Sequence, residues 1–152
     1  MFGAGMPQAA SAEDGSPTAR PDRPGRILIV EDEFFIAVVN GDALVDAGHR
    51  LVGITATAEE AVAIARAERP DLVLMDIRLA GKRDGVDAAI EIFRTLGIRS
   101  IFTTANADAG TRARAEPARP LAWLPKPFSV GKLVAVVEDA LAQTGTGSGP
   151  SV

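Results

Sequence analysis

The chain contains no cysteine, which excludes disulfides, cysteine nucleophiles and thiolate metal sites and fits a reducing compartment. It has no long apolar run: stretches such as residues 34–39 fall far short of the roughly 18 residues that a membrane-spanning helix needs. The N-terminus lacks a basic start followed by an apolar core, so we predict no signal peptide and a cytoplasmic protein. The net charge of −4 gives no general electrostatic reason to expect nucleic-acid or membrane binding.

Valine, isoleucine and leucine are missing from residues 1–25, which contain four prolines and four glycines. Such a segment cannot bury enough apolar surface to offset its ordering entropy, so we predict a disordered N-terminal tail, either an unselected extension or a flexible arm. Residues 144–152 are mostly glycine, serine, threonine and proline and predict a flexible C-terminal tail. Residues 26–143 then form one domain, which is long enough for a sizeable core.

Within that domain, short apolar runs alternate with segments of helical periodicity. We predict strands at 26–30, 50–55, 71–76, 98–104 and 121–124, and helices at 33–47, 57–68, 86–96, 108–115 and 129–143. Alternating strands and helices imply right-handed crossovers and a parallel sheet covered on both faces. The predicted fold is therefore α/β, a doubly wound five-stranded parallel sheet of the flavodoxin-like (βα)5 type with strand order 2-1-3-4-5.

Polar side chains end four of these strands, at the sheet edge where open α/β folds bind ligands. Three of them are carboxylates, Glu31, Asp32 and Asp76; their repulsion is tolerable only with a compensating cation. Oxygen ligands without histidine or cysteine favour Mg²⁺, and Mn²⁺ would also fit. Thr104 adds a hydroxyl and Lys126 a positive charge, which together suit phosphoryl transfer onto an aspartate. Taken singly, each residue could instead be a cap, a packed strand residue or a solvated charge.

The segments at 27–33 (ILIVEDE), 72–76 (LVLMD), 102–105 (FTTA) and 125–128 (PKPF) together resemble the receiver domain of bacterial two-component response regulators. Their spacing is similar to that of the chemotaxis receiver, and the resemblance covers residues 26–143. It implies that Asp76 accepts a phosphoryl group from a phosphohistidine of a sensor histidine kinase. It also implies a cis peptide between Lys126 and Pro127.

The resemblance assigns roles to the other residues as well. Mg²⁺ would be held by the acidic side chains and one backbone oxygen; the phosphoryl oxygens would meet a hydroxyl, an amide and an ammonium group. The metal ligands implied are Glu31, Asp32, Asp76 and the backbone oxygen of Arg78, and the phosphate-binding groups are Thr104, the N–H of Ala105, and Lys126. Trp123 stands at the position of the aromatic switch residue that acts with Thr104, although plain strand packing would also account for it.

Several positions depart from the usual receiver pattern. Arg78 stands where many relatives have asparagine or methionine; its side chain either reaches over the site and alters dephosphorylation or is solvated. Ala80 replaces a common proline. Arg112, Arg114 and Arg119 form either a solvated face or a surface for an acidic partner. Residues 102–106 are loosely similar to an alphaproteobacterial receiver subgroup that pairs with HWE and HisKA2 kinases, but the glycine and the aromatic residue of that motif do not match.

The resemblance implies a stand-alone receiver that signals through protein–protein contacts of its switch face, or acts as a phosphate sink or relay, as a monomer or weak homodimer. Its downstream protein is not indicated by the sequence. It would be no enzyme beyond its own phosphorylation and dephosphorylation. One alternative is a metal-dependent phosphohydrolase with an aspartate nucleophile, but Arg78 stands where that class needs a second aspartate. The other is a pseudo-receiver that signals without phosphate, although every acceptor-site residue is present. His49, the single histidine, lacks the helical-bundle context of a phosphorelay histidine.

Overall fold

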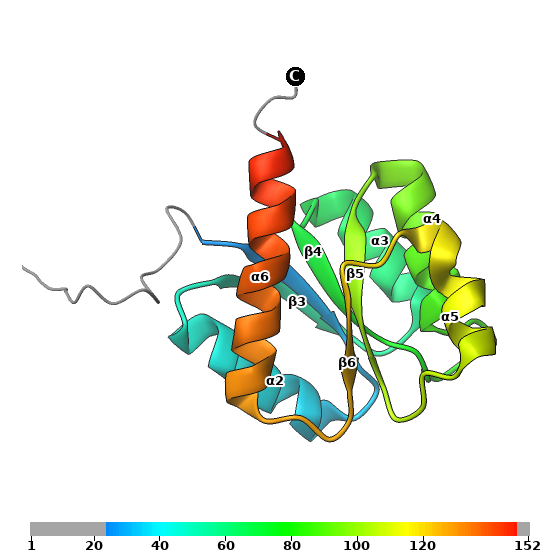
Figure 1. Cartoon of the computed structure of the whole chain (residues 1–152), viewed down its shortest axis with the longest axis horizontal. Helices are drawn as coiled ribbons and strands as arrows, with labels where there is room; N and C mark the ends of the chain where they lie inside the picture. The colour runs from blue at the N-terminus through cyan, green and yellow to red at the C-terminus, as the bar shows by residue number, and fades with distance from the viewer. Residues whose placement is uncertain (1–23, 149–152) are drawn as a thin grey trace, which may run out of the picture.

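A five-stranded parallel sheet forms the centre of the molecule (Figure 1). The structure, a computed structural model, describes residues 24–148, so most of the predicted N-terminal tail (1–23) and the last four residues (149–152) lie outside the described part. The strands run in the spatial order β3-β2-β4-β5-β6, which is the predicted order 2-1-3-4-5 and confirms the fold. Their bounds are β2 (Arg26–Val30), β3 (Arg50–Thr55), β4 (Leu72–Asp76), β5 (Arg99–Thr104) and β6 (Ala122–Pro125).

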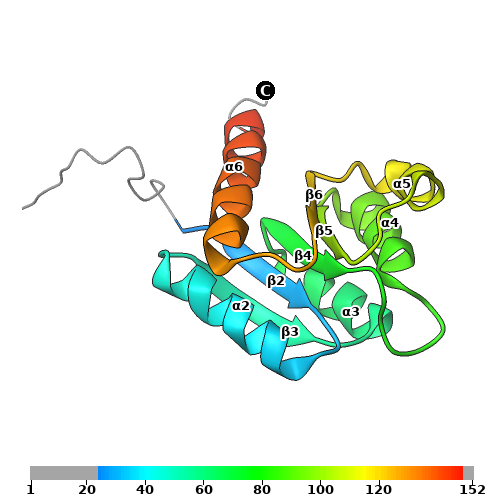
Figure 2. The same ribbon diagram turned by 60° about the horizontal axis from the view of Figure 1, so that its bottom comes forward.

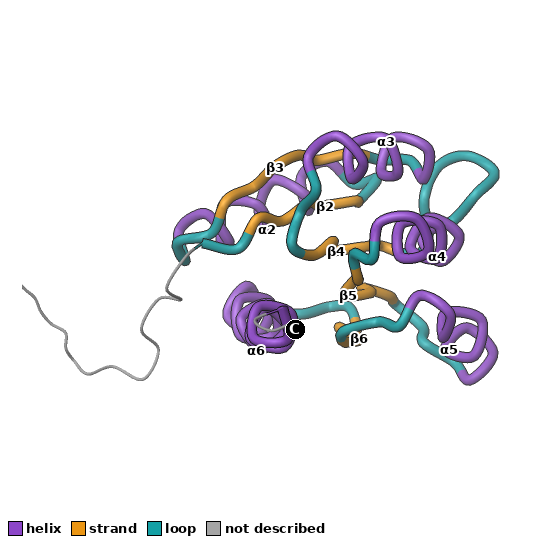
Figure 3. The backbone as a smooth tube through the Cα atoms, turned by 90° about the horizontal axis from the view of Figure 1, so that it is seen from above, coloured by secondary structure: helices purple, strands orange, loops and turns teal. Residues whose placement is uncertain are grey.

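Helices cover both faces of this sheet, as Figure 3 shows from above. One face carries α2 (Phe34–Asp46) and α6 (Val130–Ser148); the other carries α3 (Ala58–Glu68), α4 (Gly85–Leu96) and α5 (Ala109–Ala115), which continues into a 3-10 turn, η1 (Glu116–Ala118). Alternate residues of β2 divide between the two layers: Ile27 and Ile29 pack on the α2–α6 side, Leu28 and Val30 on the other. All five residues of β4 are buried, as expected for a central strand of a parallel sheet.

The structure describes a part of each segment predicted to be a tail. Helix α6 runs to Ser148, so residues 144–148 are helical. At the other end, Gly25 belongs to the fold. Its N–H donates to His49 Nδ1 at 3.1 Å, and its carbonyl accepts from Arg50 N–H at 2.8 Å. The buried His49 ring also contacts Glu138 of α6 through Nε2, at 3.2 Å.

Side-chain caps satisfy N–H groups at the starts of α3 and α4. Thr57 caps α3, accepting from Glu60 N–H at 3.2 Å, while the Glu60 carboxylate accepts from the Thr55 hydroxyl. The full capping box is at α4. There Asp84 accepts from Asp87 N–H at 3.0 Å and the Asp87 carboxylate accepts from Asp84 N–H at 3.2 Å. Two orphan N–H groups of α4 are thereby satisfied.

The N-terminal edge of the sheet repeats one arrangement of arginines. Arg69 and Arg119 each adopt a left-handed conformation, with φ of 49° and 50°, directly before a proline that leads to the next strand. In both connections, the first residue of a neighbouring strand binds the backbone there. Arg26 donates from Nη1 to the Arg69 carbonyl at 2.9 Å, and Arg99 donates from Nε to the Arg119 carbonyl at 2.6 Å. Charged donors make strong hydrogen bonds, so they offset the cost of a left-handed non-glycine residue.

At the opposite edge, Gly85 begins α4 in direct contact with the backbone of Asp76. A β-carbon at Gly85 would lie 1.9 Å from the carbonyl oxygen of Asp76. The Gly85 N–H also donates to the Ile77 carbonyl at 2.8 Å. The end of β4 and the start of α4 are therefore held together with no room for a side chain.

We expect Gly85→Ala to lower the free energy of unfolding by about 3 kcal/mol or more, because neither backbone can move without breaking the surrounding bonds. Urea denaturation followed by circular dichroism measures it. Gly110→Ala is the matched control, since the nearest atom to its new β-carbon is 3.6 Å away and alanine is the better helix former by about 0.5–1 kcal/mol. Equal effects at the two glycines would contradict the close contact at Gly85.

Candidate functional site

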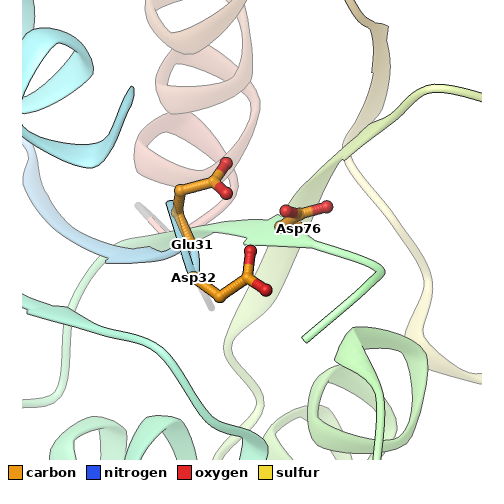
Figure 4. Close-up of side chains that lie close together, drawn as sticks. All are labelled: Glu31, Asp32 and Asp76. Atoms are coloured by element: carbon orange, nitrogen blue, oxygen red, sulfur yellow. The ribbon is translucent and has the colours of Figure 1, made fainter. Parts of the chain in front are cut away.

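Three carboxylates meet at the C-terminal edge of the sheet. Glu31 and Asp32 follow β2 directly, and Asp76 is the last residue of β4, the strand beside β2. One ligand oxygen from each lies within 4.8 Å of the other two, and Figure 4 shows the side chains around a common space. Glu31 and Asp76 are buried, whereas Asp32 is exposed. The topology thus assembles the predicted acidic group.

Lys126 reaches the same group from the far side of β5. Its Nζ lies 3.1 Å from Asp76 Oδ2 and 3.2 Å from Glu31 Oε1. The backbone holds it there: Lys126 N–H donates to the Thr104 carbonyl at 2.8 Å, and the following peptide bond to Pro127 is cis, as the resemblance implied. One ammonium group therefore bridges two strand ends that carry negative charge.

Burial and close charges shift the pKa values of two residues in this group. Burial, more than any other cause, raises the pKa of Glu31 to about 7; the Glu33 N–H opposes this, and the neighbouring Asp76 adds to it. Burial would lower the pKa of Lys126, but the two carboxylates beside it outweigh this and raise it. A single ammonium does not balance three carboxylates. The donor set, three oxygen ligands without nitrogen or sulfur, fits a hard divalent cation such as Mg²⁺.

Thr104 and Ala105 lie at this edge but do not contact the carboxylates. The Thr104 hydroxyl is buried; it accepts from Asn106 N–H at 3.0 Å and donates to the Asn106 carbonyl at 3.1 Å. Ala105 is exposed. Thr103 is in register with Asp76, because β5 pairs with β4. In this conformation the hydroxyl predicted to bind phosphate is engaged by its own loop.

Arg78 contributes its backbone to the site. Its N–H donates to Asp76 Oδ1 at 3.3 Å, while its side chain is exposed and makes no hydrogen bond or ion pair within residues 24–148. The Arg78 side chain is therefore solvated in this structure and does not reach over the site. The loop that follows is anchored by an isolated bridge between Ala80 and Thr57, so a proline is not needed to hold it.

Trp123 lies half-buried on β6, stacked against Phe102 with 4.9 Å between ring centroids. The guanidinium of Arg112 lies 4.7 Å from the centroid of the tryptophan ring, a cation–π contact that links α5 to β6. Arg114 points elsewhere, forming ion pairs with Asp84 and Asp87 at the start of α4. Two of the three arginines singled out in the sequence, Arg112 and Arg114, therefore have partners on other elements of the fold.

The contacts of Arg114 were not predicted. The capping box of Asp84 and Asp87 could have been found from the sequence, because it places two aspartates three residues apart at the start of a helix. The bond from Arg114 had no such signal, because it depends on how α4 and α5 pack.

One of the alternative hypotheses, the phosphohydrolase, can be compared with this geometry. Position 78, where a phosphohydrolase of the aspartate-nucleophile class needs an acid, presents an exposed arginine. Among the described residues, no helix is both long and apolar enough to cross a membrane.

Comparison with known proteins gives one consistent picture. Residues 27–138 match the family model described as the response regulator receiver domain. The chain is 37% identical over 120 residues to the transcriptional regulatory protein PdtaR of Mycobacterium tuberculosis, covering 79% of this chain and 58% of PdtaR. It is 41% identical over 123 residues to the phyllosphere-induced regulator PhyR of Methylorubrum extorquens, covering 79% and 45%. The chain thus spans about half the length of these curated relatives.

A solved structure agrees with these matches. The signal receiver domain of a modulated diguanylate cyclase from Desulfovibrio desulfuricans superposes with a TM-score of 0.74 at 32% identity, over 81% of this chain and 98% of that one.

The crowding of charge makes a prediction for the protein in metal-free buffer. Asp32→Asn removes one of three mutually repelling carboxylates, so we expect the free energy of unfolding to rise, by on the order of 1 kcal/mol. Denaturation in the presence of a chelator measures this. Glu33→Gln is the matched control: Glu33 is exposed, directly next in sequence and outside the acidic group, so its neutralisation should change stability by less than about 0.5 kcal/mol. A destabilised Asp32→Asn protein would contradict net repulsion.

Proposed function

Because this chain belongs to the response-regulator receiver family, we propose that it accepts one phosphoryl group on Asp76 from a sensor histidine kinase. The observation that carries the proposal is the position of Lys126, 3.1 Å from the Asp76 carboxylate, beside the acidic pair that follows β2. A nucleophilic carboxylate, a fixed ammonium and a cation-binding acidic group are the parts that phosphoryl transfer to aspartate requires.

The acidic group would hold the metal ion. Side-chain oxygens of Glu31, Asp32 and Asp76, with the backbone oxygen of Arg78, are the proposed ligands for Mg²⁺, or for Mn²⁺ in its place. When bound, the ion neutralises negative charge on the carboxylates and on the transferring group. The raised pKa of Glu31 is compatible with this, because burial first and the neighbouring Asp76 second disfavour the charged carboxylate, and a bound cation would offset both.

The chain's own groups then divide the work of transfer. An oxygen of Asp76 attacks phosphorus, the P–N bond of the donor phosphohistidine breaks, and its electron pair leaves with the imidazole, which takes up a proton. Lys126 pairs with a phosphoryl oxygen. Thr104 and the N–H of Ala105 would bind the others, and for this the Thr104 hydroxyl must first leave the Asn106 backbone. Phosphorylation would therefore require a rearrangement of the loop after β5.

The same rearrangement would carry the signal. Trp123, half-buried beside Phe102, would move with Thr104 as the switch aromatic, and the face formed by β5, α5, β6 and α6 would shift between two conformations. We propose that this face docks a downstream protein, or that the chain serves as a phosphate sink or relay. A weak dimer through the same face is compatible with either role.

Two other functions remain as outcomes of the test. An aspartate-nucleophile phosphohydrolase is disfavoured by Arg78, which is exposed where that chemistry needs a general acid. A receiver that works without phosphate is disfavoured by the intact contacts of Lys126 with Asp76 and Glu31.

We expect the protein to gain the mass of one phosphoryl group when incubated with acetyl phosphate and Mg²⁺, and to gain none in the presence of excess chelator. Asp76→Asn should abolish the gain, because it removes the proposed nucleophile; Glu31, the other carboxylate beside Lys126, is proposed only as a metal ligand. Intact-mass spectrometry measures both. Asp71→Asn is the matched control: it neutralises an aspartate at the other end of the same strand, where the side chain only accepts from Arg26 N–H at 2.8 Å.

A wild-type protein without added mass, or an Asp76→Asn protein with it, would overturn the proposal. Repeated turnover of a chromogenic phosphoester by the wild type, but not by Asp76→Asn, would favour the phosphohydrolase instead.

A further inference from the structure

Helix α5 is anchored to the domain with little apolar contact. Its seven residues read Ala-Gly-Thr-Arg-Ala-Arg-Ala, and among them only Ala115 is buried. An element with so few buried apolar groups contributes little stability of its own and can move at low cost. What holds α5 in its place must then come largely from polar contacts.

Helices α4 and α5 lie side by side (Figures 1 and 2), and Arg114 supplies polar contacts between them. Its guanidinium donates to the Asp84 carboxylate from Nη2 and lies 3.4 Å from Asp87 Oδ1 through Nη1. These are the two carboxylates of the α4 capping box, so one planar fork spans both. Burial would raise the pKa of Asp84, but the bonds from Arg114 and from Asp87 N–H outweigh it and lower the pKa. We call the three residues Arg114, Asp84 and Asp87 the arginine clasp.

The clasp lies next to the proposed phosphoacceptor. Asp84 is the N-cap of α4, and the next residue, Gly85, touches the Asp76 carbonyl with no room for a β-carbon. Gly85 N–H also donates to the Ile77 carbonyl at 2.8 Å. A displacement of the loop after β4 therefore moves the anchor of Arg114 with it.

The other end of α5 leads to Thr104. Asp108 caps the helix, and Asn106, two residues before it, holds the Thr104 hydroxyl. On its β6 side, α5 lays Arg112 over Trp123. Releasing the Thr104 hydroxyl from Asn106 therefore requires movement of residues 105–108, which lead into α5. The clasp opposes that movement because it holds α5.

We propose that Arg114 is a positioning residue whose clasp with Asp84 and Asp87 couples the loop of Asp76 to α5 and holds α5 in its resting position. The coupling to phosphorylation rests on the proposed function; the clasp itself does not. Breaking the clasp should free α5, expose Trp123 and ease the release of Thr104. The unclasped protein should therefore be phosphorylated faster although it is no more stable.

The test compares Arg114→Gln, Asp84→Asn and their double variant with the wild type. Asparagine is as good an N-cap as aspartate, so Asp84→Asn removes the ion pair and keeps the cap. Arg94→Gln is the matched control, an exposed arginine on α4 that takes no part in the clasp. Arg114→Lys should fall between the wild type and Arg114→Gln in each measurement, because lysine keeps the positive charge but lacks the planar fork of the guanidinium.

The first readout needs no phosphate. Trp123 is the only tryptophan and the chain has no tyrosine, so acrylamide quenching of its fluorescence reports on the contact with α5. We expect stronger quenching, and faster amide exchange in α5, in Arg114→Gln and Asp84→Asn, with the double variant no further from wild type than either single. Wild-type quenching and exchange in Arg114→Gln would overturn the clasp.

The second readout is the rate of phosphorylation by acetyl phosphate with saturating Mg²⁺. We expect a rise of about twofold to fivefold in both single variants, the range that a surface ion pair can account for, and none in Arg94→Gln. Stronger quenching with an unchanged or lower rate would overturn the coupling. If the wild type takes up no phosphoryl group at all, the proposed function fails, and the fluorescence readout still decides the clasp.

Discussion

One ammonium group among three carboxylates is the constraint on which the site depends. The Lys126 ammonium lies within hydrogen-bond distance of the Asp76 and Glu31 carboxylates, yet it balances only one of the three negative charges. Burial raises the pKa of Glu31 to about 7. Such a group is costly to fold, and its excess of negative charge is the reason for our proposal that a cation completes it. The parallel sheet makes it possible, because the ends of β2 and β4 and the residues that follow β6 converge on one edge.

The sequence predicted the fold and most of the site because both depend on local patterns. Apolar runs of strand length between helical segments indicate the topology, and a carboxylate directly after such a run, as at Asp76, must lie at the sheet edge. The hydroxyl of Thr104 shows where this reasoning ends. The sequence predicts that Thr104 ends a strand. It does not predict that the hydroxyl bonds to the Asn106 backbone, because that bond depends on the conformation of the loop after β5.

Long-range pairs of side chains could not be predicted from the sequence either. Arg114 meets Asp84 across 30 residues, and whether an exposed arginine is solvated or paired depends on the packing of α4 against α5. The ends of the domain also depend on features that composition does not indicate. Gly25 donates to the ring of His49, a tertiary contact that intrinsic preference does not predict, and α6 runs to Ser148.

The arginines at the far edge of the sheet have a mechanical consequence. Arg26 and Arg99 each bind the backbone of a left-handed turn that leads into a neighbouring strand, so the connections at that end are braced by charged hydrogen bonds and stiffened by proline. The connections at the acidic end have polar anchors of their own within residues 24–148, among them the clasp, the Ala80 bridge and the bond from Arg112 Nε to the Ala107 carbonyl at 3.2 Å. At the base, the bonds from Arg26 and Arg99 hold turns that lead directly into strands, so we expect a change of charge at the acidic edge to be accommodated by the loops beside that edge rather than at the base of the sheet.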